Sequence, residues 1–168
     1  MPKGLSVSSS TVSIGFQVRE AAANTFVEES VDLNLSPLDR EVFVITAINL
    51  DPTAPDMIAA TDTATTASLT TTSQTGVVNL SNANCLATAN LDIRCSAAGF
   101  VGFTRNGMET PPATLDYIGI VATNDFFVQL EGVGNTNLKG CSGKVYGYRA
   151  QASADIYAAL VQSEVLSA

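Results

Sequence analysis

The sequence predicts an all-β fold: a single-domain β-sandwich or jelly roll of about eight strands with a short C-terminal helix. Apolar and polar residues alternate with a period close to two over most of the chain, as in strands with one buried face. Turn-forming residues separate these runs at near-regular spacing, which is typical of sandwiches and barrels. The 168 residues suit one domain and no linker or repeat divides them, so we expect one jelly-roll domain over residues 1–168.

Three strands are expected in the first fifty residues. Apolar and polar residues alternate over 11–19, and again in the second half of 26–35, where Pro37 stops the pattern because proline cannot donate to a β-ladder. Residues 42–50 are apolar on both faces, which predicts a central strand that is covered on both sides. We expect residues 1–10, which precede these strands, to form a flexible N-terminal segment.

Residues 59–76 are rich in threonine and contain almost nothing apolar to bury. Threonine favours strands, but without a buried face we interpret this segment as a long exposed loop with a polar edge strand around Leu69. An O-glycosylated stretch is the alternative interpretation. Beyond it we expect three strands, at 76–80, 87–95 and 99–104. A turn at 106–107 and a break at 111–112 follow them.

The last third has the clearest strand pattern, with strands expected at 117–123, 126–131 and 144–150. Residues 153–168 then form a C-terminal helix or tail, which Ser153 can cap. A helix of this length is marginal unless its apolar side docks. It packs either on its own sandwich or against a neighbouring subunit, and the sequence leaves both alternatives open.

The chain is poor in charge and acidic. Charged residues make up 14% of it, well below the usual quarter, so few ions would lose water if a face were buried against another chain. Eight basic residues stand against sixteen acidic ones, the formal net charge is −8, and no two basic residues are adjacent. Nucleic-acid binding needs clustered lysine and arginine, so we expect no direct nucleic-acid binding.

The chemistry of an enzyme is largely missing from the sequence. The chain has no histidine, which removes the commonest general base and metal ligand, and it has no P-loop, dinucleotide or EF-hand motif. A pair of carboxylates could still hydrolyse a glycosidic bond. The candidates, each with an ordinary role on a strand face or in a turn, are Glu28, Glu29, Asp32, Asp51, Asp56 and Glu131. We predict that the protein is not an enzyme and has no catalytic or cofactor-binding residues.

Two further groups of residues invite a binding interpretation. Asp51, Asp56 and Asp62 lie close in sequence and could hold calcium with backbone carbonyls. Turn formation explains the first two without a metal, and we predict no metal site. The aromatic residues could form a binding stripe, but at strand spacing we interpret them as cross-strand core pairs: Tyr117, Phe126, Phe127, Tyr146, Tyr148 and Tyr157.

The three cysteines, Cys85, Cys95 and Cys141, match no zinc spacing. Pairing across a hairpin could bring Cys85 and Cys95 close enough to bridge. The first eight residues, however, lack the apolar run of a signal peptide, so we expect synthesis in a reducing compartment and three free thiols.

The passage LDYIGIVATNDFFVQLEG, followed by GKVYGYRAQASADIYAALVQSE, resembles the final strands and tail of single jelly-roll capsid proteins of tail-less icosahedral viruses of bacteria and archaea. The similarity covers about the last third of the chain. It implies a jelly roll that stands in a virion shell, in trimers or pseudo-hexameric capsomers, with no catalytic residues. Its partners would be copies of itself and other virion proteins, and it would be made in the host cytoplasm. Unlike small RNA-virus coats, this chain has no basic N-terminal arm to hold a genome, and contact with a membrane stays open.

Two functions from different classes therefore remain. A structural capsid subunit accounts for the scarce charge, the missing chemistry and the C-terminal pattern. A non-catalytic carbohydrate- or surface-binding β-sandwich accounts for the fold and the threonine-rich segment, but it would be expected to be exported and to expose aromatic residues. We predict the capsid subunit, and the capacity to form closed oligomers separates the two.

Overall fold

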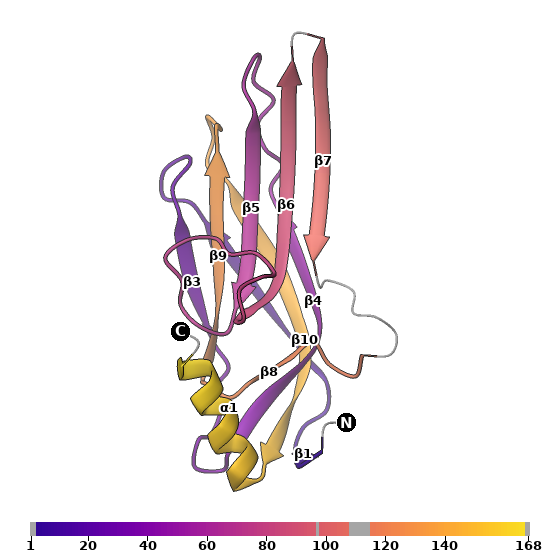
Figure 1. Ribbon diagram of the computed structural model, residues 1–168, viewed down its shortest axis with the longest axis vertical. Coiled ribbons are helices and arrows are strands. Elements are labelled where there is room, and N and C mark those ends of the chain that lie inside the picture. The colour runs from indigo at the N-terminus through magenta and orange to yellow at the C-terminus, as the bar shows by residue number, and fades with distance from the viewer. Residues whose placement is uncertain (1–2, 97, 108–114, 167–168) are drawn as a thin grey trace.

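The computed structural model describes residues 3–96, 98–107 and 115–166, which form two five-stranded antiparallel sheets packed face to face and one helix (Figure 1). The first sheet contains β1 (Leu5–Val7), β2 (Val12–Arg19), β4 (Glu41–Pro52), β8 (Gly119–Val121) and β10 (Gly140–Ala152). The second contains β3 (Val27–Asp32), β5 (Thr63–Thr70), β6 (Cys85–Ser96), β7 (Gly99–Gly107) and β9 (Asp125–Val133). The helix α1 spans Ala154–Leu166.

The order of the strands is that of a jelly roll. Strands β2, β10, β4 and β8 are neighbours in the first sheet, and β3, β9, β5 and β6 are neighbours in the second. The chain alternates between the sheets, so that two Greek keys interleave, as in the eight-stranded jelly roll. Two strands are additional: β1 continues the line of β2 along β10, and β7 extends the second sheet beyond β6. The predicted fold class is confirmed.

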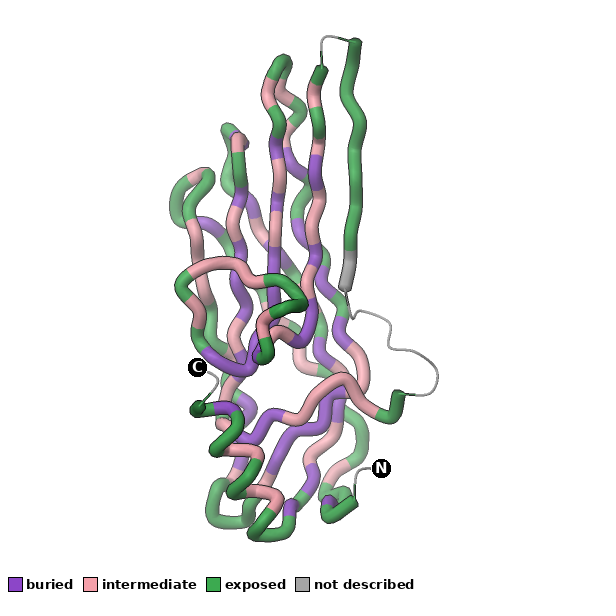
Figure 2. The backbone as a smooth tube through the Cα atoms, in the orientation of Figure 1, coloured by how far each residue is buried: buried purple, intermediate pink, exposed green. Residues whose placement is uncertain are grey.

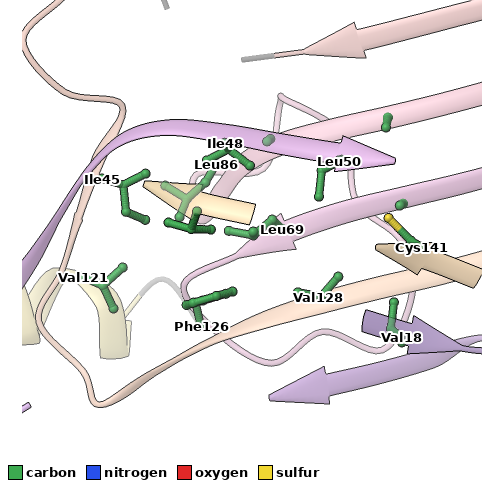
Figure 3. Close-up of a cluster of buried hydrophobic side chains, with 14 of the residues drawn as sticks. Val18, Ile45, Ile48, Leu50, Leu69, Leu86, Val121, Phe126, Val128 and Cys141 are labelled. Atoms are coloured by element: carbon green, nitrogen blue, oxygen red, sulfur yellow. The ribbon is translucent and has the colours of Figure 1, made fainter. Parts of the chain in front are cut away.

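The main core lies between the two sheets. Ile45 and Ile48 of β4 lie across from Leu69 of β5 and Phe126 of β9, and all four are completely buried (Figure 3). The ring of Phe126 also meets the Phe16 ring of β2 edge-on, with centroids 5.8 Å apart. Ile45 and Ile48 share this face although they are three residues apart, because a β-bulge at Thr46 shifts the register of β4 against β10.

A second, smaller core lies on the outer face of the first sheet. Val42 and Val44 of β4 point away from the main core and pack, with Ala150 of β10, against α1 and the segment before β8. The prediction of a central strand covered on both sides over 42–50 is therefore confirmed for residues 42–45, whereas Asn49 on the outer face is exposed. The helix contributes side chains from one face, namely Ile156, Tyr157, Leu160 and Val161. Of the two alternatives for the C-terminal segment, the structure shows packing on its own sandwich.

The N-terminal segment differs from the expectation. Residues 1–10 were expected to be flexible, but within the described part of this segment Leu5–Val7 form β1, which pairs with Ala150–Ala152. Leu5 is buried in the second core, and Ser153 donates its backbone N–H to Gly4 O at 3.1 Å. An apolar contact and a ladder of backbone hydrogen bonds thus hold a segment that has no clear alternation of its own.

The expectation for residues 59–76 is right in placing a strand around Leu69, but it is wrong about the long exposed loop and about an edge position. Residues 63–70 form β5, which lies between β6 and β9 in the middle of the second sheet rather than at its edge. Ala67 and Leu69 point into the main core, and Ser68 between them faces a covering loop over residues 71–84, from which Val78 donates its N–H to Ser68 Oγ. The two apolar residues Ala67 and Leu69 are enough to anchor β5 in the main core, because the polar face of the strand is covered by the loop.

Smaller differences follow from the same loop and from strand pairing. Residues 76–80 belong to the covering loop and not to a strand. Residues 106–107 continue β7, where they pair with Ala89 and Thr88, instead of forming a turn. The strand expected over 117–123 is reduced to β8, and the break expected at 111–112 lies outside the described residues.

Candidate functional site

The three aspartates considered for calcium lie in separate places. Asp51 is exposed on β4, and the carboxylate of Asp62 pairs with the Arg94 guanidinium at 3.1 Å. Asp56 pairs instead with the ammonium of Lys139 at 2.6 Å. Within the described ranges, no group of three or more aspartate, glutamate or cysteine side chains gathers in a way that would hold a metal ion.

Asp56 belongs to a buried polar cluster at the loop end of the sandwich. Lys139 is almost completely buried, and its ammonium donates both to Asp56 Oδ1 and to the carbonyl of Ala54 at 3.0 Å. The other carboxylate oxygen of Asp56 accepts hydrogen bonds from the backbone and side chains of Thr136 and Asn137, at 2.8–3.1 Å. The Lys139 hydrogen bond, followed by the Asn137 N–H, holds the pKa of Asp56 far below its usual range.

A second carboxylate extends this cluster. Buried Glu20 accepts the backbone N–H of Gly132 at 2.7 Å and that of Lys139 at 2.8 Å. Asn135, also buried, exchanges hydrogen bonds with Asn24 and accepts the N–H of Asp56. The cluster therefore ties the loops that follow β2, β4 and β9 into one unit, with every charge paired or hydrogen-bonded. A carboxylate with so low a pKa is a weak base, so this arrangement supports the fold rather than proton transfer.

Another polar network lies on the outer face of the second sheet. Gln129 of β9 is fully buried there and bonds to Ser68 Oγ at 2.8 Å and to Thr70 Oγ1 at 2.7 Å. Its amide also donates to Glu28, whose carboxylate accepts the N–H of Gln74 from the covering loop. Glu28, a candidate catalytic carboxylate from the sequence, thus fastens this loop over the sheet.

The covering loop leaves a groove of about 610 Å³ beside it. Thr66, Thr88 and Asn90 form its floor on β5 and β6, and Leu80 of the loop and Arg105 of β7 stand at its sides. Glu131 also lines it, whereas no aromatic residue does so among the described residues. Hydroxyl and amide groups of this kind can bind a polar ligand, but the groove lacks the ring that commonly stacks on a sugar.

The aromatic residues mostly serve the two cores. Phe126 is in the main core, and Tyr117, Tyr148 and Tyr157 pack against the second. The exposed aromatic surface lies elsewhere, on β7, where Phe100 and Phe103 are 44% and 50% exposed. Figure 2 shows this strand exposed along its described length, whereas its neighbour β6 is buried or partly buried over most of its length and exposed only near its end. The sequence predicted the strand but not its position at an open edge.

The three cysteines lie in different surroundings. Cys141 is buried in the main core, and burial raises the pKa of the half-buried Cys85 thiol to about 11. Cys95 accepts the N–H of Ala60 at 3.1 Å. All three are thiols in the structure. A thiol with a raised pKa is a poor nucleophile, so Cys85 does not suggest catalysis.

In the part of the chain that the structure describes, the helix is too short and too polar to cross a membrane.

Comparison with known proteins gives a fold-level likeness. No family model matches the chain, and no curated protein sequence matches it. Among solved structures, a chain of Desmodium yellow mottle tymovirus is similar, with 12% sequence identity, a TM-score of 0.30, and coverage of 86% of this chain and 87% of that one. The likeness covers most of the chain, whereas the resemblance seen in the sequence covers about its last third.

At this identity and TM-score the likeness carries no argument about function, and the fold assignment rests on the strand order. That order defines the chain as a jelly-roll β-sandwich, the class to which viral capsid domains, lectin domains and cupins belong.

Proposed function

We propose that this protein is a structural subunit of a virion shell that assembles through protein–protein contacts. The observation that carries the proposal is the jelly-roll strand order, because capsid domains are among the principal users of this fold. A fold alone does not fix a function, so the surface has to support it as well. Charge is scarce, and an apolar strand edge is open along β7, as expected of a chain whose surface becomes buried between subunits.

The partners in this proposal are copies of the same chain, in trimers or larger capsomers, together with other virion proteins. The location is the virion, after synthesis in the host cytoplasm. A net charge of −8 with scattered basic residues argues against direct contact with the genome. Neither buried polar cluster offers a free base or nucleophile, and this supports a structural rather than a catalytic role.

The groove favours one second candidate, a non-catalytic carbohydrate- or surface-binding module. Its hydroxyl, amide and carboxylate groups, including Thr66, Asn90 and Glu131, could recognise a polyhydroxylated ligand. Among the described residues no aromatic side chain lines this groove, and the exposed Phe100 and Phe103 lie on β7 instead, which places the candidate second.

Assembly of the purified protein tests the proposal. We expect sedimentation and native mass spectrometry at rising concentration to show closed oligomers, and electron microscopy to show shells or capsomers of uniform size. Titration with a panel of soluble oligosaccharides serves as the comparison. A protein that stays monomeric at high concentration, and whose sugar binding is lost on Asn90→Ala, would refute the capsid proposal and favour the binding module.

A further inference from the structure

Each sheet of the sandwich ends in two edges, and three of the four edges are protected. β8 is only three residues long, the β1–β2 edge is interrupted between Val7 and Val12, and β3 carries Glu28, Glu29 and Asp32. Short strands, interruptions and charges are the usual means by which proteins prevent edge-to-edge pairing.

The fourth edge, β7, carries one charged residue, Arg105, and has none of the other features along its sequence. It is nine residues long, GFVGFTRNG, and contains no proline, lysine, aspartate or glutamate. It pairs with β6 over its whole length, from Gly99 opposite Ser96 to Gly107 opposite Thr88. Among the described residues no strand pairs with its other side. A nine-residue edge whose one charge, Arg105, lies near its C-terminal end is a template for one more strand.

The side chains of β7 are those of a protein interface. Phe100 and Phe103 are about half exposed, and Val101 is 56% exposed. Phe103 stands opposite Asp92, which is buried between the guanidinium groups of Arg105, at 2.7 Å, and Arg94, at 3.6 Å. Aromatic and arginine side chains are enriched at interface centres, where lysine and acidic residues are depleted.

Charge and the side-chain pattern of β7 favour a second copy as the occupant of this edge. The β6–β7 segment, residues 85–107, carries Arg94, Arg105 and Asp92, a net charge of +1, which leaves −9 for the rest of the chain. In a two-fold contact the same surface of each copy meets its counterpart, and the repulsion is smaller at this segment than on the acidic remainder of the chain. The strand is also self-complementary, since Val101, Phe103 and Arg105 share one face of the sheet.

We propose that β7 pairs antiparallel with β7 of a second copy about a two-fold axis, so that the second sheets of two subunits form one continuous sheet. With the axis at Gly102, Val101 of one copy lies opposite Phe103 of the other, an aromatic–β-branched pair. The two Arg105 side chains then lie at opposite ends of the contact. The inference deepens the proposed function, because it names the contact that would join neighbouring capsomers in the shell.

The test is a double substitution in β7, Val101→Lys with Phe103→Lys, in the full chain. The matched control is Val133→Lys with Leu138→Lys, which adds the same charge at apolar residues that are 53% and 39% exposed. In sedimentation experiments we expect the β7 variant to raise the dimer dissociation constant by about thirty-fold or more, and the control to change it by less than about threefold. Circular dichroism and thermal melting verify that both variants fold.

Hydrogen exchange provides a readout that does not depend on substitution. In the wild-type protein we expect the peptide over residues 99–107 to exchange more slowly at high than at low protein concentration, because pairing occupies its free N–H groups. Two results would overturn the inference. One is a folded β7 variant that dimerises as tightly as the wild-type protein. The other is hydrogen exchange over residues 99–107 that does not change with protein concentration although the wild-type protein forms a dimer.

The inference and the proposed function fail in different ways. If shells form from the wild-type chain and equally from the β7 variant, the two-fold contact is wrong and the capsid function stands. If a β7-dependent dimer forms but never proceeds to larger closed species, the contact is right and the capsid function is wrong.

Discussion

The ion pair between Lys139 and Asp56 makes a direct test of how the loop end of the sandwich is held. Replacing Lys139 with methionine keeps the alkyl stem but removes both the ammonium and its bonds to Asp56 and Ala54. Removing one partner of a buried pair costs about 3–5 kcal/mol. Here the loss is smaller, because the Asp56 side chain is 19% exposed and keeps its hydrogen bonds from Thr136 and Asn137. We expect a loss of about 2–3 kcal/mol in the free energy of unfolding.

For a chain of this size that loss lowers the melting temperature by about 5–10 °C. Urea unfolding at pH 7 measures the free energy directly. Lys144→Met is the control, since Lys144 lies nearby on β10 but is exposed, and this variant should change stability by less than about 0.5 kcal/mol. A Lys139→Met protein as stable as wild type would show that the pair does not hold the three loops together.

The pH dependence of the same pair has a definite sign. The pKa of Asp56 is lowered in the folded state, so its ionised form contributes stability above its unfolded-state pKa, near 4, and that contribution is lost as the pH falls below this value. The stability difference between wild type and Asp56→Asn should therefore be full at pH 7 and narrow progressively below about pH 4. A difference that stays constant from pH 7 to pH 2.5 would contradict the ion-pair explanation.

Three further predictions test other parts of the fold by chemical unfolding. Leu69→Ala should lower the free energy of unfolding by about 2–5 kcal/mol because Leu69 is buried in the core. Leu80→Ala, at an exposed residue of the covering loop, should lower it by less than about 1 kcal/mol. Equal losses would contradict the position of β5. Glu164→Ala should lower the free energy of unfolding by about 2–3 kcal/mol because it leaves the N–H groups of Ala122 and Thr123 without their carboxylate acceptor. The control is Gln162→Ala at an exposed position of the same helix, and a Glu164→Ala protein as stable as wild type would contradict that contact. Truncation after Ala152 should lower the melting temperature whatever the oligomeric state.

The sequence predicted most of the strands because their alternation survives in the structure. β2, β6, β9 and β10 lie where the sequence pattern predicted strands, and β4 lies where a run that is apolar on both faces predicted one; each has one face in the main core. β5 was missed for a physical reason: its outward side chains are polar yet buried, because the covering loop and Gln129 satisfy them. A search for apolar alternation cannot detect a face that is buried through hydrogen bonds.

The polar clusters were missed for a related reason. Glu20, Lys139 and Asn135 lie in segments that read as ordinary loops, and they meet only because three loops converge at one end of the sandwich. The β7 edge was also hidden, since its pattern predicts a strand but does not say which strands flank it. Both features depend on topology, which sets long-range neighbours that local periodicity does not encode.

The placement of α1 decides between the two interpretations that the sequence left open. The apolar side chains of α1 lie on Val42, Val44 and Ala150 of its own sheet, and Glu164 fastens its last turn to the backbone after β8. Removing the helix therefore uncovers the second core of the same subunit and should lower the melting temperature even of a monomer. Because β7 lies in the other sheet, the truncated protein should still form the two-fold contact. Truncation that abolished the dimer without lowering the melting temperature would instead place the helix between subunits and contradict the packing described above.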